Sequence, residues 1–187
     1  MLLTAALKEW SVAVEALTSG ETVLLLRKGG IKEEKGRFSA VTDQVVLFPT
    51  FEHQKRELLK SQYQSSVEPV PSGWHPQIVQ IKAWAEITHI FLTQDADRVA
   101  ALSPLHIWQP QLAQERLKWK ANQPLYVLAL RAYRFLSPSE IAWQDSYGGC
   151  RSWISLETGM ETTGSEPAIA TPEYLRQVAE IEACLTA

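Results

Sequence analysis

Cysteine is scarce in this sequence, with only Cys150 and Cys184 among 187 residues. Two cysteines cannot form a disulfide framework or a four-cysteine metal site, and we expect no bound metal. The glycine-containing stretches lack the spacing of a Walker loop or of a dinucleotide-binding fingerprint, and we expect no cofactor. No other catalytic signature stands out, so the sequence does not by itself specify an activity.

Long hydrophobic runs are also lacking. No stretch approaches the about 18 uncharged apolar residues that a membrane-spanning helix requires. Residues 1–9 place no basic region before their short apolar stretch, which a signal peptide would have. We therefore expect a cytoplasmic protein that makes no membrane contact, of an oligomeric state that the sequence does not specify.

Apolar and charged residues are present in the proportions of a globular domain. Hydrophobic residues make up 45% of the chain, which excludes a wholly disordered protein. The net charge of −3 is unevenly distributed, because residues 157–187 contain six acidic residues against Arg176 and residues 1–156 carry +2. A mildly basic body is compatible with an anionic partner and equally with an ordinary solvated surface.

The spacing of apolar residues predicts a mixture of helices and strands. Steps of three and four predict a helix over residues 3–17, although alternation from Trp10 to Ala16 also fits a strand. Further helices are expected at 51–64, with Thr50 as the N-cap, at 95–102 and at 111–119. Strands are expected at 22–27, 38–41, 45–48, 78–92, 125–135 and 152–156, with loops at 32–36 and 65–76.

The irregular order of these elements indicates the fold class. With two hairpin-like pairs, it predicts an α+β fold whose sheet is mainly antiparallel, or curled into a partial barrel, with packed helices. Residues 1–157 are expected to form one domain, residues 158–170 a linker, and residues 171–187 a C-terminal helix that begins at Thr171-Pro172. The sequence leaves open whether this helix docks on its own domain or on a partner chain.

A candidate anion site lies where a strand ends in Arg27-Lys28-Gly29-Gly30. Backbone N–H groups in a glycine turn can line a concavity that neighbouring cations make attractive to phosphate. Lys-Gly-Gly turns also occur in hairpins for steric reasons alone, so an ordinary turn is the alternative. Two further cations, Arg131 and Arg151, are candidates for the same anion or nucleic-acid site.

Two other motifs could carry acid–base or nucleophilic chemistry. Glu52 and His53 follow a strand directly, and a histidine there could act as a general base near neutral pH. Cys150 lies in a glycine turn beside Arg151, whose charge favours a thiolate. A cysteine nucleophile would need a histidine nearby in the fold. The alternatives are a capping turn with an exposed histidine and a small residue at a tight turn.

Tryptophan is abundant for this length, and several of the seven stand beside lysine or arginine. Aromatic rings flanked by cations stack unpaired bases and neutralise their phosphates, but tryptophan also fills small cores. We expect at least four to be structural. The seven are Trp10, Trp74, Trp84, Trp108, Trp119, Trp143 and Trp153.

Several linked segments make the chain resemble the cyanobacterial domain-of-unknown-function family 1802. The segments are residues 7–10, 24–31, 47–54, 105–108, 124–125, 130–133 and 147–153, and the resemblance spans residues 4–156. The family has no assigned activity. Some members occur with a restriction-endonuclease-like domain, so the resemblance implies a role in restriction–modification or another nucleic-acid transaction. We expect this chain to lack such a domain, which argues against carrying a cleavage function over from it.

These observations lead to three functional hypotheses. The first is a non-catalytic module that binds a phosphorylated ligand or nucleic acid through Arg27, Lys28, the Gly29-Gly30 turn and the other arginines. The second is a hydrolase or nuclease that uses Glu52 and His53, with Cys150 as a further candidate. The third is a protein–protein adaptor, which would present an exposed apolar patch.

Overall fold

The computed structural model describes residues 1–29, 32–34, 37–39, 42–119 and 122–186. Seven strands form one mixed sheet in the order β2-β7-β6-β5-β1-β8, and β9 pairs with β7. Their bounds are β1 (Leu2–Trp10), β2 (Leu24–Arg27), β5 (Gln44–Thr50), β6 (Ile78–Thr93), β7 (Leu125–Ala142), β8 (Trp153–Glu161) and β9 (Glu166–Pro167). The strands β3 (Lys32–Glu34) and β4 (Arg37–Ser39) form a separate hairpin.

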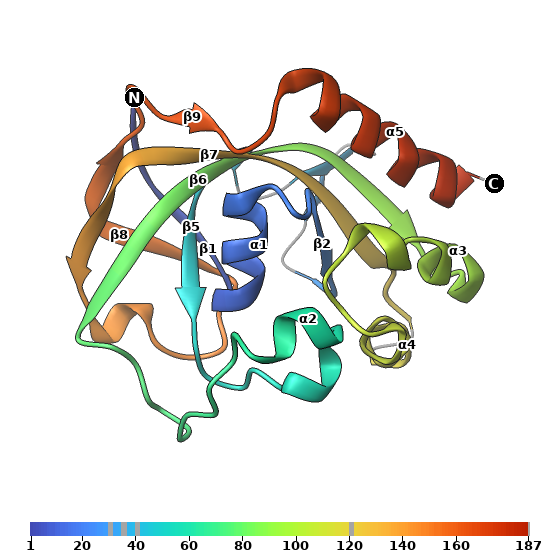
Figure 1. The fold of residues 1–187 in the computed structure, drawn as a ribbon, viewed down its shortest axis with the longest axis horizontal. Coiled ribbons are helices and arrows are strands. Elements are labelled where there is room, and N and C mark those ends of the chain that lie inside the picture. Colours follow the sequence, from blue (N-terminus) through green and yellow to red (C-terminus); the bar gives the residue numbers. More distant parts are fainter. Residues whose placement is uncertain (30–31, 35–36, 40–41, 120–121, 187) are drawn as a thin grey trace.

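Five α-helices among the described residues pack around this sheet. They are α1 (Ser11–Ser19), α2 (Ser61–Gln64), α3 (Ala96–Ala101), α4 (Pro110–Lys118) and α5 (Thr171–Thr186), with 3₁₀ helices at Arg56–Leu58, Ser103–Leu105 and Asp145–Tyr147. Figure 1 shows β6 and β7 arching across the molecule, with α1 under the arch and α5 over it. The sheet is curled but not closed, and the predicted α+β fold with a mainly antiparallel sheet is confirmed.

The first segment of the chain is a strand, and the predicted helix is wrong for its first eight residues. β1 lies between β5, to which it is parallel, and β8, to which it is antiparallel. Neighbouring strand residues point to opposite faces, yet Ala6 and Leu7 are both fully buried. Because both faces of β1 are covered, pairing and burial override the helix propensity of its Ala, Leu, Lys and Glu residues. The helix α1 begins only at Ser11.

Hydrophobic clusters pack on both faces of the sheet. Along β5, Val45 and Leu47 belong to one cluster, whereas Val46 and Phe48 belong to the other. Trp84 and Trp108 are buried. Trp10, Trp143 and Trp153 are partly buried against the clusters. The expectation that at least four tryptophans are structural is therefore confirmed.

The helix predicted over residues 51–64 is wrong, because tertiary contacts hold this segment in turns. Residues 51–54 form a turn, and only a 3₁₀ helix and the one-turn α2 follow. The Gln54 side chain accepts hydrogen bonds from Ser11 Oγ at 3.1 Å and from the Val12 N–H at 3.3 Å. It thereby satisfies the N-terminus of α1 instead of continuing a helix of its own.

Other predicted elements agree with the structure to differing degrees. Most of the other predicted helices and strands are confirmed in type, although their ends are shifted. The confirmed helices are those at 95–102, 111–119 and 171 onward. The confirmed strands are those at 22–27, 45–48, 78–92, 125–135 and 152–156. The loop predicted at 32–36 is wrong for Lys32–Glu34, which form β3. The strand predicted at 38–41 overlaps β4, and its residues 40–41 lie outside the described residues.

The C-terminal helix α5 packs on its own chain. Tyr174, Val178, Ile181 and Leu185 join the hydrophobic cluster that also contains α1. The preceding segment 158–170, expected to be a linker, contains the end of β8 and all of β9. The division into domain, linker and helix stays a prediction. In the described part of the chain, no helix is long and apolar enough to cross a membrane.

Candidate functional site

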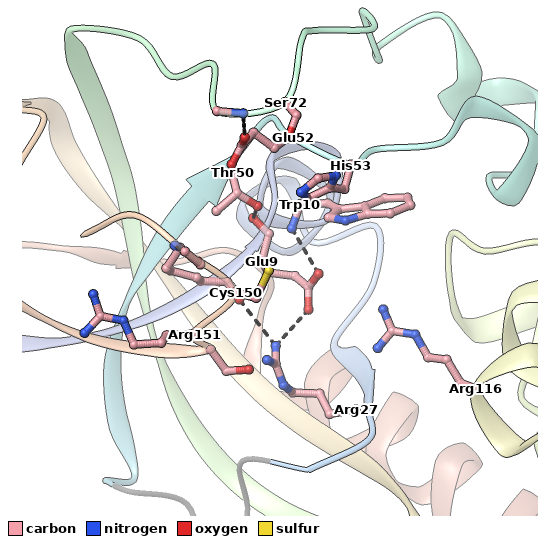
Figure 2. A pocket seen from close by; sticks show the side chains of 14 residues that line it. Glu9, Trp10, Arg27, Thr50, Glu52, His53, Ser72, Arg116, Cys150 and Arg151 are labelled. Carbon is pink, nitrogen blue, oxygen red and sulfur yellow. Dashed lines mark hydrogen bonds and ion pairs between the residues drawn. The ribbon is translucent and has the colours of Figure 1, made fainter. Parts of the chain in front are cut away.

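A pocket of 460 Å³ opens at the edge of the sheet where β1 and β5 end. Because these strands run parallel, their C-terminal residues meet at one edge, and Trp10 lies opposite Thr50. The other walls come from the end of β2, the turn after β5, the 71–76 loop, α4 and the turn at residues 149–152. Figure 2 shows side chains converging from these separate elements. The pocket therefore depends on the tertiary fold.

An ion pair between Arg27 and Glu9 lies in the wall of this pocket. Arg27 Nη1 is 2.9 Å from Glu9 Oε2, and both side chains are less than 10% exposed. The same Nη1 donates to the Lys8 carbonyl at 3.4 Å, and Glu9 Oε1 accepts from the Trp10 N–H at 3.0 Å. The two bonds from Arg27 join β2 to β1, which are not neighbours in the sheet, so they bridge its open side.

Lys8 places a second buried cation in the pocket wall. Its Nζ donates to the carbonyl oxygens of Tyr147 at 2.5 Å and of Gly149 at 2.8 Å. Burial lowers the pKa of Lys8, and the nearby charge of Arg151 lowers it further. The ammonium therefore holds the 148–150 turn against β1, with carbonyl oxygens rather than a carboxylate as its hydrogen-bond acceptors.

Arg116 enters the pocket from α4. Its Nη1 donates to the Leu26 carbonyl, and its guanidinium lies 6.0 Å from the centre of the Trp108 ring. Burial lowers the pKa of Arg116, and Glu9 opposes this shift. Figure 2 shows Arg116 and Arg27 approaching the pocket from α4 and β2, respectively.

Arg151 and Cys150 line the pocket from the turn before β8. Arg151 Nη2 donates to the Ser146 carbonyl at 2.8 Å, and in Figure 2 its guanidinium points away from the group around Glu9. Cys150 is exposed, and its sulfur points toward Glu9 and Arg27 in the same view. Arg151 therefore stabilises the turn, while the thiol faces the pocket.

Glu52 and His53 line the opposite side of the same pocket. The Glu52 carboxylate accepts a hydrogen bond from the Gly73 N–H, which ties the 71–76 loop to the turn after β5. His53 has a φ of 61°, a left-handed conformation that is uncommon for a residue other than glycine. The structure thus places the predicted acid–base residues in the lining of the same pocket as Arg27 and Cys150.

We call the 460 Å³ pocket the first pocket. Lys28 and Gly29 line a second, neighbouring compartment of 320 Å³ instead. The Lys28 side chain is buried, and its Nζ donates to the Leu117 carbonyl at 3.2 Å. Burial lowers its pKa. Gly29 has a φ of 107°, which a residue with a side chain rarely adopts. Gly30, the other glycine of the predicted turn, lies outside the described residues.

Arg131 lies elsewhere, next to α5. Its Nη2 donates to Thr171 Oγ1 at 2.6 Å, and its guanidinium lies 5.6 Å and 5.8 Å from the rings of Tyr133 and Tyr174. The sequence-based grouping of Arg131 with Arg27 therefore does not match the arrangement in the fold, in which Arg131 joins α5 to β7.

Basic side chains outnumber carboxylates around the first pocket. With His53 neutral, the lining carries a formal charge of +2. In the described part of the chain, the ion pair within this lining is that of Glu9 and Arg27. Burying charge without a counter-charge is costly, so an anion in this pocket would lower an existing cost. The basic residues are Lys8, Arg27, Arg116 and Arg151, and the carboxylates are Glu9 and Glu52.

Sequence analysis did not single out Lys8, Glu9 or Arg116. The available signal was the Lys8-Glu9 pair inside an otherwise apolar segment, which is unusual for a central strand. Arg116 gave no comparable signal, because basic residues near the C-terminus of a helix are ordinary. Among the described residues, no group of three or more His, Cys, Asp or Glu side chains could hold a metal ion.

Comparisons with known proteins give a family and two distant structures. The family described as "Domain of unknown function (DUF1802)" matches residues 6–180. No curated protein matches the chain significantly. Crystal structures of two point mutants of ZmASCH from Zymomonas mobilis are 12% and 10% identical, with TM-scores of 0.46 and 0.43. Each match covers 94% of this chain, and 96% and 94% of the respective ZmASCH chain. Similarity at this level carries no information about function.

Proposed function

The chain belongs to the DUF1802 family of unknown function, and we propose that it is a non-catalytic module that binds a phosphorylated ligand, a nucleotide unit of nucleic acid, in its first pocket. The observation that carries the proposal is the excess of basic side chains around this pocket. Lys8 and Arg116 donate to backbone carbonyls there, whereas the buried carboxylate Glu9 pairs with Arg27. The restriction–modification context stays a prediction.

The walls of the pocket suit a nucleotide better than a bare anion. Trp10 lines it as a partly buried indole that packs edge-on against Trp108 at 5.0 Å between ring centres. Thr50, Ser72 and Ser152 supply hydroxyl groups to the same lining. An aromatic face can stack a base while the basic groups bind its phosphate.

The binding test compares adenosine 5′-monophosphate with adenosine by calorimetry at low and high salt. We expect Lys8→Met to weaken binding of the monophosphate about ten- to a hundredfold, because a hydrogen bond to a charged group contributes about 1.5–3 kcal/mol. Lys82→Met is the matched control, because Lys82 lies on the surface and pairs with Glu15. We expect it to bind like the wild type.

A second pair of variants covers the case in which Lys8→Met does not fold. Arg116→Met removes a basic group from the pocket, and Arg98→Met removes one from the surface of α3, where Arg98 is 3.8 Å from Asp95. Circular dichroism establishes which variants fold. No monophosphate binding at low salt, or equal affinity of the wild type and the folded pocket variants, would overturn the proposal.

Hydrolysis is a second candidate, because Glu52, His53 and Cys150 line the same basic pocket. An acid–base pair and a thiol beside a bound phosphodiester are the groups that nucleophilic cleavage needs. We expect binding without cleavage when labelled RNA and DNA oligonucleotides are incubated with the protein. Product that the wild type forms, and that His53→Ala and Cys150→Ser do not, would establish the second candidate instead.

The adaptor hypothesis has less support. Exposed large hydrophobic side chains lie on separate elements, such as Leu136 on β7, Leu175 on α5 and Trp74 in the 71–76 loop. A partner surface would gather such side chains into one patch.

A further inference from the structure

The first pocket adjoins the neighbouring compartment, and the two share part of their lining. Arg27, Arg116 and Ser152 line both spaces, which have volumes of 460 and 320 Å³. Each volume lies near the lower end of the range found for small-ligand pockets. A chain of linked small units could therefore occupy both spaces, with the link between two units at the shared wall.

Among the described lining residues, each compartment has one tryptophan. Trp10 lines the first, and Trp119, which is 57% exposed, lines the second. The two arginines of the shared wall stand between them. Within the described part of the chain, the hydrogen bonds of these two guanidinium groups are made by Nη1, and each group also carries Nη2 and Nε as donors.

Charge in the second compartment is of one sign. Among its described lining residues, Arg27, Lys28 and Arg116 are basic, and none is a carboxylate. Lys28 also lines a third space of 430 Å³, together with Lys118 and the amides of Gln94 and Gln114. The basic lining thus extends from the end of β1 past the end of β2 to α4.

We propose that the two compartments form a path for single-stranded nucleic acid, in which two successive bases stack on Trp10 and Trp119 and the phosphodiester between them binds Arg27 and Arg116. This proposal rests on the proposed function and specifies its ligand. An unpaired strand is required, because paired bases would not expose their faces to the indoles and buried cations are out of reach of a rigid duplex backbone.

The experiment compares adenosine 5′-monophosphate with the adenylate trinucleotide, as RNA and as DNA, by calorimetry. We expect the trinucleotide to bind about tenfold or more tightly than the monophosphate, because a second base stacks and a second phosphate is neutralised. Its affinity should also fall more steeply with salt. Trp119→Leu should lower this affinity ratio several-fold, to the part that the second phosphate contributes, and Trp119→Phe should retain most of the ratio.

The control is Leu175→Ala, which removes an exposed apolar side chain from α5 and should keep the wild-type ratio. A ratio that Trp119→Leu leaves unchanged, or a duplex that binds as tightly as the single strand, would overturn the strand path. If the monophosphate binds but the trinucleotide binds no more tightly, the path is wrong and the proposed function stands. If neither ligand binds, the proposed function itself is wrong.

Discussion

Replacing Glu9 with alanine is expected to lower the free energy of unfolding by about 3–5 kcal/mol, because it leaves the Arg27 guanidinium buried without its counter-charge. The two side chains are 7% and 9% exposed, so the guanidinium is largely shielded from bulk water. The variant also removes the acceptor for the Trp10 N–H. Urea unfolding followed by circular dichroism measures the change.

Glu15 provides the matched control for this experiment. It pairs with Lys82 at 2.8 Å, and both of these side chains are largely exposed. Glu15→Ala should lower the free energy of unfolding by less than about 1 kcal/mol, as exposed ion pairs do. Equal losses for Glu9→Ala and Glu15→Ala would show that the Glu9–Arg27 pair is not buried as the structure has it.

The double variant Glu9→Leu/Arg27→Met tests why the pair is present. Apolar replacements of a buried ion pair are often neutral or stabilising, so much of the stability lost in Glu9→Ala should return. Binding of adenosine 5′-monophosphate should be weakened because the Arg27 guanidinium no longer donates to the phosphate, although the formal charge of the lining stays at +2. Recovery of stability together with loss of binding would indicate that the Glu9–Arg27 pair is needed for ligand binding and not for the stability of the fold.

Lowering the pH from 6.5 to 4 is expected to cost about 3 kcal/mol of stability through His106 alone. This imidazole is 3% exposed, and burial, followed by the charge of Lys60, lowers its pKa from 6.5 to about 4. Between these pH values the unfolded chain binds a proton that the folded chain does not. The neutral His106 therefore makes its full contribution to the free energy of unfolding above pH 6.5, and this contribution is lost as the pH falls toward 4.

The position of His106 explains this cost. Its Nδ1 accepts a hydrogen bond from the Trp108 N–H at 3.2 Å, which places the ring proton of the neutral form on Nε2. Nε2 is buried and has no hydrogen-bond partner among the described residues. A second proton would therefore put charge into an apolar site and remove the acceptor for Trp108.

The variant His106→Asn isolates this effect, because its amide oxygen can still accept from the Trp108 N–H and does not titrate. Urea unfolding of both proteins between pH 4 and 7 gives the comparison. The difference between the wild type and His106→Asn should change by about 3 kcal/mol across this range. Parallel stability curves would contradict the buried, neutral histidine.

Local sequence signals identified much of the secondary structure. Alternating apolar residues indicated β6 and β7, and the Thr171-Pro172 start with its apolar stripe indicated α5. The same kind of reasoning was wrong for β1, because its residues are good helix formers that pair with β5 and β8 on either side. It was also wrong for residues 51–64, where Gln54 caps a helix that is distant in the sequence.

The candidate site was only partly accessible from the sequence. Arg27, Lys28, Glu52, His53, Cys150 and Arg151 were identified by residue type and local motif, and the fold brings them to two adjoining compartments. Arg131 fits the same motif logic, yet it lies next to α5. Lys8, Glu9 and Arg116 are ordinary in their local sequence and gain their place in the site from strand order and helix packing alone.

The sequence by itself determined the α+β class, the amphipathic C-terminal helix and a surplus of basic residues before position 157, because propensity, periodicity and charge are local properties. Only the tertiary structure decided which of those charges meet. The parallel pairing of β1 with β5 brings Glu9 and Thr50 to one edge, and the curl of the sheet brings Arg27 across to them. Such contacts link residues far apart in the chain, so no local pattern encodes them.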